Sequence, residues 1–244
     1  MGHEPPTVRP VPSGQDTYSS GIATASRYTD WMVSPFKPYL RGNIAEIGIG
    51  HGGYYSVLAS YGTYVGIDID ERSIRDASAR FPDGRFVKAD ILNRGFIGDL
   101  IPGGADSIIS INVLEHIDDD ETALKNLADA LKVGGTLMIN VPALPALYND
   151  LDRLAGHYRR YSIAGFKRML AGAPMELLKL CYFNPIGGVG WWLNRFHRHE
   201  SLNSDVVNRQ IEIFDKYVLP LSRMLDPMTR RYFGQSLVCI ARRI

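Results

Sequence analysis

A glycine-rich segment and a carboxylate that follows it are the residues whose types and spacing point most clearly to chemistry. Residues 46–53 read EIGIGHGG, and Asp68 ends the next apolar run, twenty positions after Gly48. Glycines let the backbone approach a ligand closely, and a carboxylate at the tip of the neighbouring strand can accept hydrogen bonds from both hydroxyls of a ribose. The pair therefore indicates a site for a ribose-bearing cofactor.

Two further carboxylates favour a cationic adenosine compound over a pyrophosphate. Glu46 precedes the first glycine on an otherwise apolar strand, where a buried carboxylate requires hydrogen-bonded partners or a cationic ligand. Asp90 ends a later apolar run, where an adenine amino group could donate to it. Gly48, Gly50 and Gly53 also match the dinucleotide pattern G-x-G-x-x-G, so an NAD-dependent oxidoreductase stays open as an alternative.

From residue 43 onward, predicted strands and helices alternate along the chain and could position these residues. This alternation is typical of a parallel sheet with crossover helices. Asp70 can cap a helix that extends to Arg80. The acidic turn 118–121 is expected to cap a second helix rather than to take part in catalysis. Gly134-Gly135 is expected to end that second helix and start the fifth strand. An apolar stripe from 207 to 225 predicts a helix bent at Pro220. The predicted strands are 43–47, 64–68, 85–88, 106–111, 136–141, 176–182 and 236–242.

Composition narrows the class of protein. The chain has 244 residues, 45% of them hydrophobic and 22% charged, with a formal net charge of +1. These values are typical of a soluble globular protein, and no Lys/Arg stripe indicates a nucleic-acid partner. Cys181 and Cys239 are expected to be buried, reduced thiols, which fits a cytoplasmic location. Residues 180–193 are too few and too interrupted to span a bilayer, so no stable membrane insertion is expected.

Four motifs, in order, resemble those of the class I S-adenosylmethionine-dependent methyltransferases. They are EIGIGHG at 46–52, GID at 66–68, ADI at 89–91, and NVLEH at 112–116 followed by LKVGGT at 131–136. The resemblance covers about residues 40–145. It implies an α/β fold with a Rossmann-like, doubly wound sheet of seven strands, one of them antiparallel, and helical lid elements.

The resemblance also implies that S-adenosylmethionine is the cofactor, and it gives each matching position a role. Gly48 and Gly50 would let the loop approach the methionine part, and Asp68 would hold the ribose. Charge-assisted hydrogen bonds contribute about 1.5 to 3 kcal/mol each, so loss of Asp68 should weaken affinity about tenfold to a hundredfold. The other expected cofactor contacts are Glu46, Asp90 and Asn112, Ile69 and Ile91 on the two ring faces, and Tyr18 and Arg27 at the methionyl carboxylate.

Methyl transfer needs mainly alignment of the acceptor with the methyl group, and sometimes removal of a proton. His116, His157 and Tyr18 are the candidate catalytic residues, with Tyr28 a further candidate base or orienting group. Glu115-His116 also raises metal binding. Because the sequence shows no second cluster of ligands, no metal site is expected.

Aromatic segments outside the core should select the acceptor. They are 16–39, with Tyr18, Tyr28, Trp31 and Phe36; 156–161, GHYRRY; and Trp191-Trp192. A flat stacking pocket built from them favours a small planar aromatic or N-heterocyclic metabolite of secondary metabolism, methylated on nitrogen or oxygen. The layout faintly resembles the azapteridine N-methyltransferases of toxoflavin-type biosynthesis. The arginines of 156–161 could instead tether the lid to the core.

Two further alternatives remain, and the domain organisation is expected to be simple. The apolar stretch 185–193 keeps open a lipid or quinone-like acceptor, and the chain could be a non-catalytic, cofactor-binding partner subunit. We expect a disordered, proline-rich lead-in over 1–15 and one domain over 16–244, as a monomer or homodimer. That domain divides into an N-terminal lid (16–40), a core (41–182), a helical insertion (183–234) and a last strand (235–244).

Overall fold

The computed structural model describes residues 25–98, 100–196 and 205–244. The predicted lead-in and Tyr18 lie outside the described residues, so their expected roles stay predictions.

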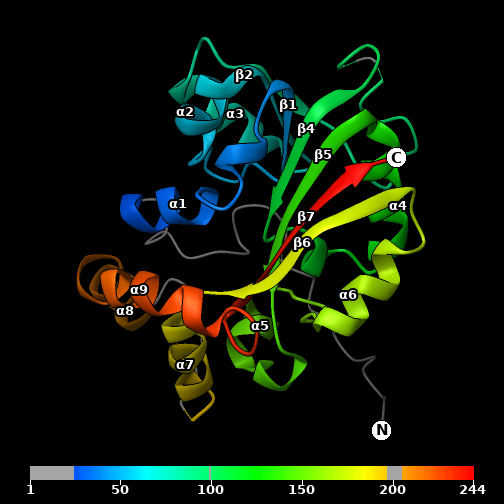
Figure 1. Cartoon of the computed structure of the whole chain (residues 1–244). Helices are drawn as coiled ribbons and strands as arrows, with labels where there is room; N and C mark the ends of the chain where they lie inside the picture. Colours follow the sequence, from blue (N-terminus) through cyan, green and yellow to red (C-terminus); the bar gives the residue numbers. More distant parts are fainter. Residues whose placement is uncertain (1–24, 99, 197–204) are drawn as a thin grey trace, which may run out of the picture.

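A central sheet of seven strands organises the molecule (Figure 1). Its order is β3-β2-β1-β4-β5-β7-β6. The pairs from β3 to β5 are parallel, whereas β7 is antiparallel to both β5 and β6. This confirms the doubly wound sheet with one antiparallel strand. The strand order reverses between β1 and β4, which places the ligand site of such a sheet at the carboxyl ends of these strands. The strands are β1 (Gly42–Ile47), β2 (Gly62–Asp68), β3 (Phe86–Lys88), β4 (Ala105–Ile111), β5 (Leu131–Pro142), β6 (Met175–Phe183) and β7 (Ser236–Arg243).

Two predicted helix starts are confirmed, and one predicted helix end is wrong. Helix α3 (Glu71–Arg80) begins where the Asp70 side chain accepts a hydrogen bond from the Arg72 amide at 3.0 Å. Helix α4 (Asp120–Ala130) begins where Asp119 accepts from the Thr122 amide at 3.1 Å. However, α4 ends at Ala130, and Gly134-Gly135 lies inside β5. The register shift in the pairing of β4 with β5 absorbs the glycines within the strand.

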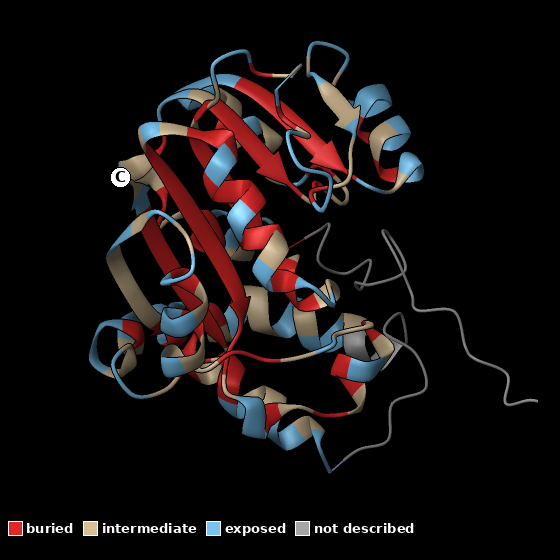
Figure 2. Cartoon of the chain, turned by 90° about the vertical axis from the view of Figure 1, so that its right-hand side faces the viewer, coloured by how far each residue is buried: buried red, intermediate tan, exposed pale blue. Residues whose placement is uncertain are grey.

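Helices cover both faces of the sheet and divide the core in two. Helices α1 (Ser26–Val33), α2 (Tyr55–Leu58) and α3 lie on one side, and α4 and α6 (Ile163–Leu170) on the other (Figure 1). The central strands are almost wholly buried, while the helices alternate buried and exposed residues (Figure 2). Phe36 is fully buried in one core and Phe166 in the other. The short 3₁₀ turns are η3 (Lys37–Tyr39), η4 (Ala59–Tyr61), η5 (Leu114–His116) and η6 (Pro145–Leu147).

The helices between β6 and β7 gather with α5 (Asp150–Leu154), near the end of the sheet where β5 finishes (Figure 1). They are α7 (Pro185–Asn194), α8 (Asp205–Ile213), the π-helix η7 (Phe214–Val218) and α9 (Leu219–Thr229). The predicted single helix is interrupted by η7, which precedes Pro220 in the first turn of α9. Proline has no amide hydrogen and clashes with the preceding turn, so a wider turn there accommodates it.

The described part of the predicted N-terminal lid packs into the core. Trp31 and Phe183 have ring centroids 4.3 Å apart, and the Tyr28 amide donates to Asp215 Oδ1 at 2.6 Å. Helix α1 is thereby attached to elements from the other end of the chain.

Both cysteines are free, and Cys239 is buried, which raises the pKa of its thiol to about 12. Within the described ranges, every helix is too short or too polar to cross a membrane.

Candidate functional site

Three carboxylates lie at the same edge of three adjacent strands. Glu46 is the penultimate residue of β1, Asp68 is the last of β2, and Asp90 follows β3 by two positions. These strands are neighbours in the order β3-β2-β1, and they run in parallel. The acids that the sequence analysis grouped are therefore brought to one edge.

The glycine loop lies against this edge with backbone angles that favour glycine. Gly48 has φ +74° and Gly50 has φ +51°. A Cβ on Gly48 would lie 2.3 Å from Cγ2 of Val113, in the segment that follows β4. The Gly50 amide donates to Asp68 Oδ2 at 3.1 Å, and the Asp70 amide donates to Oδ1 at 2.8 Å. Each carboxylate oxygen has a second lone pair, so Asp68 is fixed and can still accept from a ligand hydroxyl.

Glu46 is a buried acid, and one of its carboxylate oxygens is available to a ligand. It is 3% exposed, and its Oε2 accepts from the Tyr64 hydroxyl at 2.5 Å, whereas Oε1 has no hydrogen-bond partner in the described ranges. Burial raises the pKa of Glu46 to about 8; the Tyr64 bond opposes the shift and the Asp68 charge adds to it. A nearby cation would satisfy the free oxygen and stabilise the charged form.

The expected adenine contacts are present in part. Asp90 is half-buried and accepts from the Leu92 amide at 2.9 Å. Ile69 is 57% exposed beside Asp68, so its side chain is available to cover a ring. Ile91 is buried among core residues and offers little surface. Both isoleucines remain predictions as ring contacts.

Asn112 and Arg27, two other expected cofactor contacts, are both exposed. Asn112, directly after β4, is exposed with φ +54°, a sparsely populated conformation for a residue other than glycine. Arg27 is exposed and lines a hollow together with α9 residues Leu219, Pro220 and Arg223. Tyr28 is half-buried, and burial of its hydroxyl raises its pKa to about 12, against the effect of a hydrogen bond with the Asn184 side chain.

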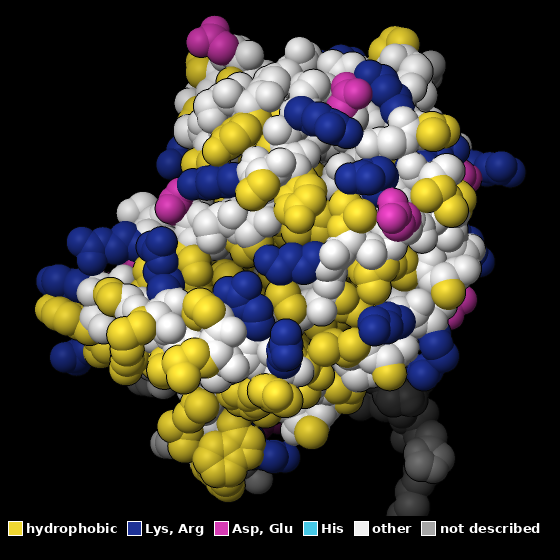
Figure 3. Space-filling view, viewed as in Figure 1, with side chains coloured by type: hydrophobic (Ala, Val, Ile, Leu, Met, Phe, Trp, Pro, Cys, Tyr) yellow, Lys and Arg dark blue, Asp and Glu magenta, His cyan; other side chains and the backbone are white. Residues whose placement is uncertain are grey.

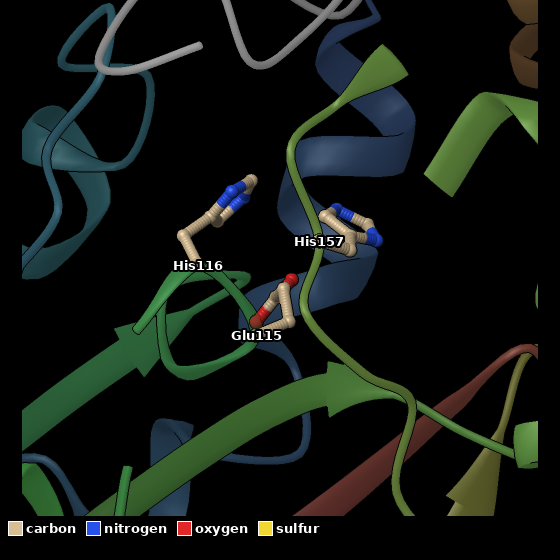
Figure 4. Close-up of side chains that lie close together, drawn as sticks. All are labelled: Glu115, His116 and His157. Carbon is tan, nitrogen blue, oxygen red and sulfur yellow. The ribbon is translucent and has the colours of Figure 1, made fainter. Parts of the chain in front are cut away.

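A second cluster forms where the segment after β4 meets the segment after α5. Glu115 and His116 come from η5 and His157 follows α5, and their ligand-type atoms all lie within 4.8 Å of one another. Figure 4 shows the Glu115 carboxylate between the two imidazole rings. The ring centroids are 4.8 Å apart. Burial raises the pKa of Glu115 to about 7 and lowers that of His116 to about 3.

Asp152 organises the wall of this cluster. Its fully buried carboxylate lies 2.8 Å from His157 Nδ1 and accepts from Arg160 Nε at 2.8 Å. It also accepts from the Trp191 indole at 3.0 Å and from the Asn149 amide at 3.0 Å. Burial opposes its ionisation, but the His157 hydrogen bond and the Arg160 charge hold the pKa of Asp152 below its usual value.

The arginines of 156–161 attach this loop to the starts of α4 and α5; their predicted tethering of the lid to the core stays a prediction. Arg159 donates to Asp120 at 2.8 Å and to Asp118 at 3.1 Å, and Arg160 pairs with Asp152. The structure brings together His157 and His116, which were predicted as two separate candidate bases. The sequence did not lead us to Asp152. A usable signal was the capping box that Asp152 forms with Asn149 at the start of α5, because Asp152 lies five residues before His157.

Comparison with known proteins supplies the family. A family model described as a methyltransferase domain matches residues 45–137. A methyltransferase of Mycobacterium tuberculosis with no established function is 32% identical over 133 residues, which are 53% of this chain and 66% of that protein. The glycine loop, the acids and the cluster segment after β4 all fall within the matched range. The chain belongs to the class I S-adenosylmethionine-dependent methyltransferases.

A second curated relative of this methyltransferase has a named substrate. The trans-aconitate 2-methyltransferase of Afipia carboxidovorans is 30% identical over 171 residues, which are 66% of this chain and 62% of that protein. The chain thus spans about two thirds of the length of the curated relatives that it matches.

Solved structures agree on the fold of the methyltransferase. A S-adenosylmethionine-dependent methyltransferase from Archaeoglobus fulgidus has a TM-score of 0.60 at 16% identity, covering 89% of this chain and 94% of that one. The [4+2]-cyclase SpnF has a TM-score of 0.55 at 14% identity, covering 89% and 80%. These likenesses show the fold alone, and the fold also carries a cyclase.

The residues present fit the family's cofactor, S-adenosylmethionine. The unpartnered Glu46 oxygen suits its ammonium group, the anchored Asp68 suits ribose hydroxyls, and the missing side chain of Gly48 leaves room for close approach.

Proposed function

We propose that this chain transfers a methyl group from S-adenosylmethionine to a nitrogen or oxygen atom of a small molecule. The observation that carries the proposal is the row of Glu46, Asp68 and Asp90 at one edge of three adjacent strands, under a glycine loop. The family match supports the same reaction, because it covers this edge. An NAD-dependent reaction has no comparable support.

The chain's own residues would mainly bind and orient. The bound cofactor supplies an electrophilic methyl group on a sulfonium. Asp68 would hold the ribose through its free lone pairs, and Glu46 would balance the cofactor's positive charge from beneath the loop. Asn112, next to Val113 and hence to the glycine loop, would border the acceptor. Buried side chains around the site would exclude water.

The acceptor we propose is a small planar aromatic or N-heterocyclic molecule. Glu115 and His116 of the cluster lie shortly after β4, and His157 adjoins the aromatic side chain of Trp191 through Asp152. Tyr158 beside them is exposed. Aromatic surfaces next to a few polar groups favour stacking of a flat ligand. The trans-aconitate relative, whose named substrate is small, supports a small-molecule acceptor.

Calorimetry with S-adenosylhomocysteine tests the cofactor site. Asp68→Ala should weaken affinity about tenfold to a hundredfold, since charge-assisted bonds to a ribose are lost. Asp83→Ala is the matched control, because Asp83 is exposed in the turn that precedes β3. Unchanged affinity in Asp68→Ala would refute the site. Release of S-adenosylhomocysteine with a panel of heterocyclic and phenolic acceptors tests turnover.

A lipid or quinone-like acceptor is the second candidate, because an apolar and basic surface adjoins the site. Figure 3 shows apolar side chains gathered over α7, α8 and α9, with lysine and arginine among them. Helices with apolar side chains flanked by cations favour anionic membrane surfaces. The exposed apolar residues are Val189, Trp192 and Leu193 on α7 and Leu221, Met224 and Met228 on α9, with Arg195, Arg223 and Arg231 exposed nearby.

Flotation with vesicles of anionic phospholipid separates the two acceptor classes. An apolar acceptor predicts flotation with anionic but not with neutral vesicles, and its loss in the double variant Met224→Glu, Met228→Glu. Wild-type protein that stays at the bottom of the gradient supports the water-soluble acceptor.

A further inference from the structure

The cluster of Glu115, His116 and His157 contains polar atoms that have no partner within the described part of the chain. Glu115 is fully buried, and neither of its carboxylate oxygens has a hydrogen-bond partner among the residues that the structure describes. Nδ1 of His116 is also buried, and no described residue bonds to it. Leaving a buried carboxylate and an imidazole nitrogen unsatisfied costs several kcal/mol in a folded protein. These atoms come from one turn, η5, and point to a common partner.

The His157 imidazole is oriented by a hydrogen bond on its far side. His157 Nδ1 lies 2.8 Å from the Asp152 carboxylate, so Nε2 is its remaining nitrogen. The His116 ring lies against the backbone of Gly156, and its buried Nδ1 has no partner among the described residues. An imidazole whose other nitrogen is bound to a carboxylate or a backbone carbonyl is oriented as metal-ligating histidines are.

We infer that Glu115, His116 and His157 bind a divalent transition-metal ion. Two imidazoles and one carboxylate favour zinc, iron, cobalt or nickel over magnesium and calcium, which prefer oxygen ligands alone. The donor atoms lie within 4.8 Å of one another, so small side-chain movements bring them around one ion. The sequence pattern favoured no metal because the third ligand, His157, lies far along the chain from Glu115 and His116.

Three protein ligands leave coordination positions open for an acceptor oxygen. This extension rests on the proposed function. A metal-bound hydroxyl loses its proton more readily to solvent, and its oxygen can then form the bond to the methyl carbon. The sulfur–methyl bond breaks at the same time, and its electron pair returns to sulfur to give the neutral thioether. Hydroxyl acceptors would thus be methylated preferentially.

Metal binding can be measured without turnover. The full chain is purified with chelator, then titrated with Co²⁺ and with Zn²⁺ by calorimetry, and Co²⁺ binding is also followed by its visible absorption. We expect one ion per chain for both metals, and much weaker binding of Mg²⁺. Failure of wild-type protein to bind either Co²⁺ or Zn²⁺ would overturn the inference.

Variants place the ion at the cluster. Glu115→Gln keeps the shape of the side chain and should lower Co²⁺ affinity at least about a hundredfold. Loss of a direct ligand should weaken metal binding more than loss of a residue that only orients a ligand. His157→Gln should do the same, while Glu176→Gln, an exposed acid on β6, should leave affinity unchanged. Full Co²⁺ affinity in both cluster variants would contradict this placement. S-adenosylhomocysteine affinity, measured on the same samples, separates failure of the metal site from failure of the cofactor site.

Discussion

His157 directs Nδ1 at the fully buried carboxylate of Asp152, 2.8 Å away, and so leaves Nε2 for the cluster with Glu115 and His116. The same Asp152 oxygen accepts a hydrogen bond from Arg160. One carboxylate therefore sets the ring orientation of His157 and neutralises a buried guanidinium.

Replacement of Asp152 by asparagine should destabilise the fold strongly. The variant leaves the Arg160 guanidinium, whose side chain is 1% exposed, buried without its counter-charge. We expect the free energy of unfolding to fall by about 3–5 kcal/mol, measured by urea denaturation with a chelator present. The double variant Asp152→Asn, Arg160→Met should regain part of this loss, because no unpaired charge stays buried. A double variant less stable than the single one would argue against the charge explanation.

Stability should depend on pH through Glu46. Its pKa is about 8 in the folded chain against the ordinary 4.5, so between these values the folded state binds a proton more tightly than the unfolded state. The contribution of Glu46 to stability is therefore fully present below about pH 4.5 and is lost as pH rises through about 8. Glu46→Gln removes this decline, on the order of a few kcal/mol, when the free energy of unfolding is compared at about pH 5 and pH 8.5. The exposed-acid control Glu176→Gln should follow wild type.

Gly48→Ala and Gly53→Ala form a matched pair in one loop. Alanine at 48 meets Val113 and requires φ +74°, whereas a Cβ at Gly53 has no heavy atom of the described residues within 4 Å. The left-handed conformation costs about 1–2 kcal/mol, so the loop of Gly48→Ala should relax away in the free protein. Cofactor binding must then restore it, which weakens S-adenosylhomocysteine affinity about tenfold. Equal affinity in the two variants would show that the loop does not approach the cofactor.

Trp191→Phe tests how α7 is attached to the site. The indole donates to Asp152, and the Arg160 guanidinium lies 4.9 Å from the ring centroid. Phenylalanine keeps a ring but loses the bond to the charged carboxylate, so we expect a loss of about 1.5–3 kcal/mol in the free energy of unfolding. The neighbouring Trp192→Phe, at an exposed position, should change it by less than about 0.5 kcal/mol. A similar loss in both variants would assign the effect to general packing of α7.

Local patterns predicted most of the sheet and the cofactor edge. The seven strands follow β-branched runs, and Asp70 and Asp119 cap their helices because short polar side chains reach free amides. The predicted end of α4 was wrong because a pair of glycines usually ends a helix. Here Leu131 already pairs with Ala105 before Gly134 is reached, so long-range strand pairing outweighs the local signal.

The second cluster could not be predicted in the same way. His157 reaches Glu115 because an isolated bridge pairs Ala143 with Tyr161 and turns the intervening chain back across the end of β5. The Tyr158 amide then donates to the Glu115 carbonyl at 2.8 Å. Such a return path depends on tertiary pairing and has no periodic signal in the sequence.

The attachment of α1 to Asp215 and Phe183 bears on how acceptor preference could be re-engineered. A chimera that exchanges the segment between β6 and β7 for that of a relative would lose the acceptor of the Tyr28 amide, because Asp215 belongs to the exchanged part. Helix α1 would then face a surface that it did not evolve with. Grafts between members of this family therefore need to move both pieces together, although they are encoded at opposite ends of the chain.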